Sequence, residues 1–167
     1  AIDFSHLTYV GGEIDLENNQ LTNVSFGNIV RVGAGISLRH NRLTDIDFGN
    51  ITGTSSGVHL DNNRLTDIDF KNITSIEGGV YLDKNRLTTI DFGQLTNVGG
   101  ELNLSNNNLT VIDFGQLKTI AGILTLYNNR LSRVNCTGIT IAGCLMIDHD
   151  VALINCPAKC TIAHFFP

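Results

Sequence analysis

The sequence predicts an open solenoid of about seven stacked coils, rich in short strands and with little or no helix. Two regularities carry this prediction. A leucine follows a repeated asparagine by two residues, and a phenylalanine (Cys136 in the last repeat) follows it by seven. The asparagine itself recurs at one constant interval without slippage, at Asn19, Asn41, Asn63, Asn85, Asn107 and Asn129. Because so short a unit cannot bury an apolar face alone, the units must stack.

The repeat divides the chain into three parts. Residues 1–10 form a partial repeat, since Ile2-Asp3-Phe4 matches a stretch found in later repeats, and residues 11–142 hold six full repeats of equal length. Residues 143–167 hold a degenerate repeat and a cysteine-containing C-terminal cap. Because the chain begins within a repeat, we expect it to be the C-terminal part of a longer repeat protein. Self-association through the uncapped N-terminal end is the alternative.

Each repeat is predicted to hold one short strand that ends just before the asparagine. Side chains alternate along it, so that Leu82 points inward while Tyr81 and Asp83 point outward. Strands of successive coils then pair in one parallel ladder. An amide carries two donors and an acceptor. Each repeated asparagine is therefore expected to point into the coil and to bond backbone groups where the chain leaves the strand, since a buried group left unpaired costs about 1–3 kcal/mol.

The rest of each repeat is predicted to be extended or 3₁₀, with room for a second short parallel ladder. Leu65, Ile68 and Phe70 point inward there, and the inward phenylalanines are expected to stack as an aromatic spine. Aspartate also recurs at the same place, at Asp3, Asp47, Asp69, Asp91 and Asp113. We expect each to form an Asx turn by accepting the backbone N–H two residues on. A row of calcium sites is the alternative, but one aspartate per coil supplies too few oxygens.

The pattern LxLxxNxL at a 22-residue period resembles the leucine-rich repeat family, and the resemblance covers residues 2–156. It implies a horseshoe-class solenoid with a parallel sheet on a concave face, and recognition of a protein or glycan ligand through that face. The leading leucine of the family's repeat is replaced by glycine or alanine, as at Gly33 and Ala121. The resulting repeat pattern is similar to that of the L domains of growth-factor receptors and related fungal wall proteins.

Outward strand positions vary from repeat to repeat, whereas the inward ones barely change. Nothing in folding demands large aromatic or basic side chains there, and such residues are typical of interface hot spots. The candidate partner-binding patch consists of Arg39, His40, His59, Tyr81, Lys84 and Tyr127. A merely solvated, mixed face is the alternative.

Two further columns repeat with the coil. A basic column lies just past the asparagines, at Arg42, Arg64, Arg86 and Arg130. It indicates either a stripe for an acidic partner or glycan, or a solvated edge balanced by nearby carboxylates. Threonines recur as well, for example at Thr52, Thr74 and Thr96. Flat threonine arrays would suit an ice-binding solenoid, although threonine also simply suits exposed strand positions.

All four cysteines lie at the C-terminal end, from Cys136 onward, where the final apolar coil must be covered. Cys136 and Cys156 end the similar stretches Val-Asn-Cys and Ile-Asn-Cys, which would place them about 5 Å apart on adjacent coils. We therefore predict the disulfides Cys136–Cys156 and, by elimination, Cys144–Cys160. A zinc site with His149 or His164 and free buried thiols remain the alternatives. Disulfides would indicate an extracellular or cell-surface protein.

Composition and motifs narrow the function further. Net charge is −5, which argues against a nucleic-acid binder, and no apolar run approaches the roughly 18 residues of a membrane span. No catalytic, cofactor-binding or metal-binding motif occurs, so we expect no enzyme, cofactor or metal site. The favoured function is an extracellular protein- or glycan-recognition module. A structural or cell-surface repeat protein without a specific ligand is the alternative.

Overall fold

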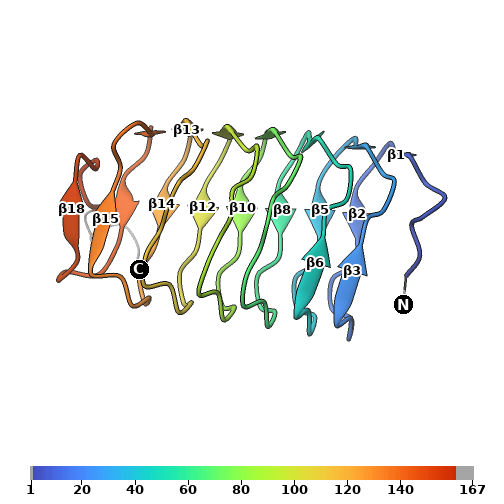
Figure 1. Ribbon diagram of the computed structural model, residues 1–167, viewed down its shortest axis with the longest axis horizontal. Coiled ribbons are helices and arrows are strands. Elements are labelled where there is room, and N and C mark those ends of the chain that lie inside the picture. The colour runs from blue at the N-terminus through green and yellow to red at the C-terminus, as the bar shows by residue number, and fades with distance from the viewer. Residues whose placement is uncertain (1, 161–167) are drawn as a thin grey trace, which may run out of the picture.

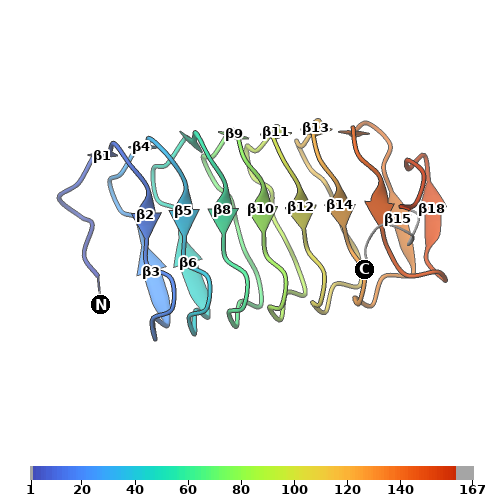
Figure 2. The same cartoon turned by 180° about the vertical axis from the view of Figure 1, so that it is seen from behind.

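The computed structural model describes residues 2–160, which form a parallel β-solenoid of about seven turns (Figure 1). The coils follow one another along the long axis of the molecule, and the view from behind shows the same order (Figure 2). Every strand pairing is parallel, and residues 2–160 contain no helix. Each coil therefore contacts mainly the coil before it and the coil after it.

Two sheets run the length of the stack. The sheet that leads into the repeated asparagines, here called the ladder sheet, consists of β2 (Ile14–Asp15), β5 (Ile36–Ser37), β8 (Val58–His59), β10 (Val80–Tyr81), β12 (Leu102–Asn103), β14 (Leu124–Thr125) and β17 (Leu145–Met146). The second sheet consists of β1 (Tyr9–Val10), β4 (Arg31–Val32), β7 (Gly53–Thr54), β9 (Ser75–Ile76), β11 (Asn97–Val98), β13 (Thr119–Ile120) and β16 (Thr140–Ile141).

Two further parallel sheets have only two strands each. β3 (Asn23–Ser25) pairs with β6 (Asp45–Asp47), and β15 (Arg133–Asn135) pairs with β18 (Ala152–Ile154). Paired residues are one full repeat apart through most of the stack, as Val80 and Leu102 are. The interval is one residue shorter at the last turn, where Leu124 pairs with Leu145. The degenerate repeat thus keeps its place in both sheets.

The second short parallel ladder for which the sequence left room is present, because each regular coil contributes a strand to both sheets, and it runs the full length of the stack. The second-sheet strands are only two residues long and their outward residues are small or polar, as at Gly53, Ser75 and Asn97. In the ladder sheet the alternation continues past the two-residue strand, as from Val80 to Leu82, whereas past the second-sheet strand β9 it ends at Gly78, so hydrophobic periodicity gives little signal there. The full-length parallel sheets define the architecture. A concave face remains an expectation of the sequence resemblance.

The aromatic spine is confirmed and runs from the N-terminal partial repeat through the regular coils. Ring centroids of successive phenylalanines lie 5.6 Å (Phe4 to Phe26), 6.0 Å, 5.5 Å, 6.0 Å and 6.3 Å (Phe92 to Phe114) apart, with the rings stacked. Phe26, Phe48, Phe70 and Phe92 are almost completely buried. Because each ring contacts the next, the spine joins neighbouring coils through their interior.

The asparagines form a buried ladder that joins neighbouring coils at each step. Asn85 Nδ2 donates to the carbonyls of Leu82 in its own coil (3.1 Å) and Leu60 in the preceding coil (2.9 Å). Its Oδ1 accepts from the backbone N–H of Leu65 (3.0 Å). Asn107 repeats these contacts one coil later. The predicted backbone bonding is confirmed, and the bonds to the preceding coil add a link that the sequence analysis did not predict.

The repeated aspartates form the expected Asx turns. Asp47 Oδ1 accepts the backbone N–H of Gly49 at 2.9 Å, and Asp3, Asp69, Asp91 and Asp113 accept the N–H two residues on in the same way. Lys71 Nζ lies 2.7 Å from Asp47 Oδ1. The hydrogen bond from Lys71 and that from the Gly49 N–H hold the pKa of Asp47 below its ordinary value. Within residues 2–160, no group of three His, Cys, Asp or Glu side chains could hold a metal ion.

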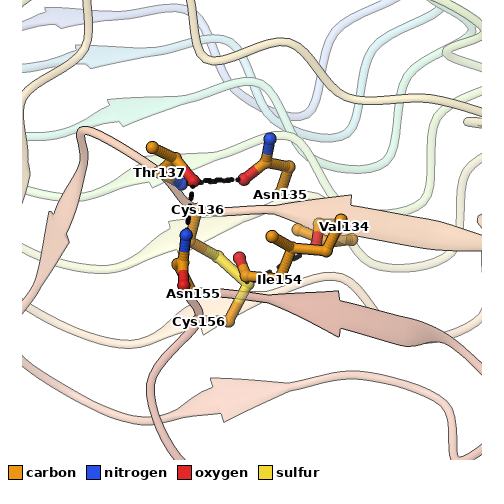
Figure 3. Close-up of a disulfide and its surroundings, with 7 residues drawn as sticks. All are labelled: Val134, Asn135, Cys136, Thr137, Ile154, Asn155 and Cys156. Atoms are coloured by element: carbon orange, nitrogen blue, oxygen red, sulfur yellow. Dashed lines mark hydrogen bonds between the residues drawn. A yellow bond between two sulfur atoms is a disulfide. The ribbon is translucent and has the colours of Figure 1, made fainter.

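Two disulfides tie down the C-terminal coil, as predicted. Cys136 is bonded to Cys156 and Cys144 to Cys160, with Cα–Cα distances of 4.9 and 5.0 Å. The first bridge lies where β15 and β18 end side by side (Figure 3). No cysteine of the described chain is free, so the zinc and thiol alternatives are wrong for these residues. His164, named in the zinc alternative, lies outside the described residues.

Replacing an asparagine of the ladder should lower the free energy of unfolding, and the loss should be larger for a buried asparagine that bonds two coils than for an exposed one that bonds only its own coil. Asn85→Ala would leave one N–H and two carbonyls without a partner in a buried site, so we expect its free energy of unfolding to fall by at least about 2 kcal/mol. Asn19 bonds only carbonyls of its own coil and is exposed. Asn19→Ala should therefore cost less than about 1 kcal/mol. Equilibrium unfolding in urea measures both values, and equal losses would contradict the ladder's role.

Candidate binding face

The outward side of the ladder sheet contains a shallow hollow of about 330 Å³. The polar hollow, as it is called below, is lined by Arg39, His40, His59, Asp61, Asn62, Tyr81, Asp83 and Lys84. Five of the six residues of the predicted patch therefore lie together around it. Tyr127, the sixth, is 38% exposed but does not line the hollow. It lies two coils beyond Tyr81 on the same side of the stack, two residues after the end of β14.

The hollow takes its residues from three neighbouring coils. Successive strands are in register, so that His59 lies opposite Tyr81 in the parallel pair of β8 and β10. The residues that follow these strands add two further columns, one with Arg39, Asp61 and Asp83 and one with His40, Asn62 and Lys84. Asp61, Asn62 and Asp83 were missed as candidates, although they stand at the same repeat positions as the basic residues that were chosen.

His59 and Tyr81 form a stacked aromatic pair, with ring centroids 4.6 Å apart and planes within 11°. Glycine two residues earlier in each coil provides the space for them. A Cβ at Gly79 would lie 2.8 Å from the Tyr81 ring, and one at Gly57 would lie 3.1 Å from His59 Nε2. In the following coil, Glu101 occupies the glycine position and the smaller Asn103 the ring position. Glycine at this position therefore leaves room for the Tyr81 ring, and at Gly57 and Gly35 it also leaves room for a backbone carbonyl of the next coil, 2.9 and 2.7 Å from the site of a Cβ.

Arg39 is held between two acidic side chains. Its Nε lies 3.6 Å from Asp61 Oδ2 and 3.9 Å from Glu17 Oε2. Neither contact is a hydrogen bond, and this Nε is buried without a hydrogen-bond partner. Asp61 is only 6% exposed and accepts a hydrogen bond of 2.9 Å from Asn62 Nδ2. The Arg39 guanidinium therefore offsets part of the negative charge beneath the hollow.

Asp83 is the carboxylate that the fold leaves least compensated. Burial, followed by the negative charge of Asp61 one coil away, raises the pKa of Asp83 above its ordinary value. Burial and the charges of Glu101 and Asp83 also raise the pKa of Tyr81. Within the described residues, the Asp83 carboxylate accepts no hydrogen bond from another residue and has no ion pair within 4 Å. It is therefore free to accept hydrogen bonds from a ligand.

One column of the hollow lies on strained backbone. The residue just before each ladder asparagine is left-handed, with φ between 54° and 57° at Asn18, His40, Asn62, Lys84, Asn106 and Asn128. Asparagine tolerates this conformation better than other side chains that carry a Cβ, because its short amide bonds locally. Four of the six positions follow that preference. The two exceptions, His40 and Lys84, both line the polar hollow; histidine also favours this conformation, and a further left-handed lysine, Lys71 (φ 48°), lies outside the hollow.

The basic column is exposed and lies outside the polar hollow. Backbone hydrogen bonds keep its arginines in register, as in Arg64 N to Leu43 O (2.9 Å) and Arg86 N to Leu65 O (2.9 Å). The ion pairs found among residues 2–160 involve Arg39 and Lys71 and none of these arginines. The column is therefore exposed to solvent and makes no ion pair within 4 Å among the described residues.

A second hollow, of about 230 Å³, lies over the second sheet near Arg31, Gly53 and Glu77. Four of the five hydroxyl groups that line it, all but that of Ser55, already have partners within the chain. Thr52 and Thr74 donate to backbone carbonyls of the preceding coil (3.2 and 3.1 Å), and Ser75 donates to Glu77. Polar groups that already form intramolecular hydrogen bonds have less remaining capacity to bond a ligand. The polar hollow of the ladder sheet is consequently the stronger candidate site.

Comparison of the chain with models of protein families, with curated protein sequences and with solved structures gives no match. Within residues 2–160 no helix is long and apolar enough to cross a membrane.

Relieving the backbone strain at Lys84 should stabilise the chain. Asparagine suits the left-handed conformation better than lysine, so we expect Lys84→Asn to raise the free energy of unfolding by about 1 kcal/mol. Asn18→Lys, at the equivalent position of an outer coil, should lower it by a similar amount. Urea unfolding of the three proteins tests the pair. A loss of stability in Lys84→Asn would show that Lys84 makes a structural contribution that outweighs its strain.

The raised pKa of Asp83 predicts a pH-dependent stability. The folded chain holds this proton more tightly than the unfolded chain, so the stability associated with it is lost as pH rises through and above the ordinary aspartate pKa of about 3.9. Asp83→Asn should therefore raise the melting temperature at pH 7, and the gain should shrink towards pH 3. Asp47→Asn should do the opposite, lowering the melting temperature at pH 7 with a loss that fades towards pH 3, because the Asp47 pKa is lowered. Thermal unfolding between pH 3 and 7 measures both.

Proposed function

We propose that the chain is an extracellular recognition module of the leucine-rich-repeat kind, which binds a protein or glycan ligand through the outward side of the ladder sheet. The observation that carries the proposal is the make-up of the polar hollow. It combines five predicted patch residues with two non-asparagine side chains, His40 and Lys84, on strained backbone that asparagine would suit better. Strain of this kind gathers at functional sites more often than elsewhere.

A rigid scaffold supports binding through such a face. The asparagine ladder and the phenylalanine spine join every regular coil to its neighbours, so the outward columns are held before any ligand arrives. Little conformational entropy is then lost when a ligand binds, and the interaction energy is not spent on ordering the site. The variable outward residues set the specificity, while the inward residues maintain the shape.

The extracellular assignment rests on the C-terminal cap. Two disulfides, Cys136–Cys156 and Cys144–Cys160, are expected in an oxidising compartment, since the thiols of most cytosolic proteins stay reduced. The six asparagine sequons of the repeats, at Asn23, Asn50, Asn72, Asn103, Asn108 and Asn135, agree with this compartment but arise easily in a chain so rich in asparagine and threonine.

The double variant Tyr81→Ala/Tyr127→Ala tests the proposal. Both side chains are at least partly exposed, so the melting temperature should stay within a few degrees of the wild-type value. The chain, with both disulfides intact, is applied to a glycan array and to a panel of secreted proteins. We expect the wild type to bind at least one ligand and the double variant to lose it. Lys118 is an exposed basic residue beside the second sheet, so the variant Lys118→Ala serves as the control and should bind the ligand as the wild type does.

Failure to bind any ligand, or binding that the double variant retains, would contradict the recognition function. If no ligand is found and removal of residues 1–10 changes the oligomer size in solution, the structural or cell-surface alternative is favoured.

A thermal-hysteresis measurement addresses the ice-binding alternative. Several of the repeated threonines, including Thr52, Thr74 and Thr96, already donate their hydroxyl hydrogens to backbone carbonyls, at 3.2, 3.1 and 3.0 Å.

A further inference from the structure

We propose that the polar hollow is a subsite for one uncharged sugar residue of a glycan. This inference rests on the proposed recognition function and narrows its ligand. It is carried by three features of the hollow: the balance of its charges, the number of its unpartnered polar groups and the position of its aromatic pair.

The side chains that line the hollow carry equal numbers of positive and negative charges, and the carboxylate of Glu17 lies beside Arg39 just outside the lining. Arg39 and Lys84 contribute two positive charges, and Asp61 and Asp83 contribute two negative ones. A strongly cationic ligand would meet Lys84 at the rim, and a strongly anionic ligand would meet Asp83. An uncharged ligand that offers both donors and acceptors avoids both penalties. A sugar residue has this character, because each hydroxyl can donate to a carboxylate and accept from an ammonium or amide.

Several groups able to form those hydrogen bonds have no hydrogen-bond partner in the described chain, and of these only Arg39 is engaged in ion pairs, with Asp61 and Glu17. The side chains that make no hydrogen bond to another described residue are those of Arg39, His40, His59, Tyr81, Asp83 and Lys84. The second hollow differs, since all of its hydroxyls but that of Ser55 are engaged by the backbone or by Glu77. Hydrogen bonds to charged groups such as Asp83 and Lys84 are the stronger ones. The hollow therefore retains the capacity to orient a ligand.

The aromatic pair offers an apolar surface beside these polar groups. His59 covers one face of the Tyr81 ring, with the centroids 4.6 Å apart. Both rings line the hollow, and the register partner of Tyr81 in the next coil is the smaller Asn103, which does not line it. The electron-rich face of an aromatic ring favours contact with partly positive hydrogens, such as the C–H groups of a sugar ring. A sugar seated in the hollow against this aromatic pair would thus contact an apolar surface while its hydroxyls reach Asp83 and Lys84, which line the same hollow.

The size of the hollow also favours a small ligand unit. Its volume of about 330 Å³ lies at the low end of the range for small-molecule sites, roughly 300–1,000 Å³. A stable protein–protein interface buries about 800 Å² on each partner, which would have to extend well beyond the hollow towards residues such as Tyr127. A single sugar subsite requires only the residues that already meet here.

Titration of the full, disulfide-bonded chain with free sugars tests the inference. The probes are glucose, galactose, mannose and N-acetylglucosamine, and binding is followed through the amide resonances of the protein in NMR spectra. We expect at least one to shift the resonances of the hollow with a dissociation constant in the millimolar range. Asp83→Asn and Tyr81→Ala should each weaken that binding by about tenfold or more. Lys118→Ala should leave it unchanged.

Charged analogues sharpen the result. Because the lining side chains carry equal numbers of positive and negative charges, glucosamine and glucuronate should bind no more tightly than the uncharged sugars. A tenfold preference for glucuronate would identify an anion site instead, and the same preference for glucosamine would identify a cation site. Either result would overturn the inference.

The outcomes separate this inference from the function on which it rests. If no sugar binds but a secreted protein is bound through Tyr81 and Tyr127, the recognition function stands and the sugar subsite is wrong. If sugars bind but Asp83→Asn and Tyr81→Ala have no effect, the subsite lies elsewhere and this inference fails. If neither sugars nor proteins bind, both the inference and the recognition function fail.

Discussion

The buried asparagine ladder is the interaction on which the rest of this solenoid depends. Each amide within the stack bonds its own coil and the coil before it, as Asn85 does with Leu82, Leu60 and Leu65. These bonds can form only if successive coils are displaced by one full repeat, so the ladder fixes the register as well as the stability. A shift of one residue would turn every inward leucine outward and leave the amides without partners.

A fixed register makes the outer surface a set of straight columns. His59 stacks on Tyr81, and Arg39 lies beside Asp61, because equal repeat positions in neighbouring coils are always adjacent. The same geometry places like charges next to each other. Asp61 and Asp83 are such a pair, and the pKa of Asp83 is raised by burial and by the charge of its neighbour. The regularity that stabilises the interior thus brings unfavourable neighbours together outside, where a ligand can compensate them.

Much of this arrangement can be predicted from the sequence, for reasons that differ between elements. The asparagines, the phenylalanines and the Asx turns repeat with one period, so each copy supports the interpretation of the others. The disulfides follow because Cys136 and Cys156 end similar stretches on adjacent coils. The second sheet could be predicted only as room for a further short ladder, since around strands such as Gly53–Thr54 and Asn97–Val98 no hydrophobic alternation marks its position.

The candidate site was predicted only in part, and the missing part has a physical explanation. Hot-spot composition selects aromatic and basic side chains, so it found Arg39, Tyr81 and Lys84 but not Asp61 or Asp83. Whether a carboxylate is compensated depends on its burial and on its neighbours in other coils, which no single repeat reveals. The strain at His40 and Lys84 is likewise visible only once the backbone is known. Comparison of one repeat position across all coils would nevertheless have flagged both residues, because the other four coils have asparagine there.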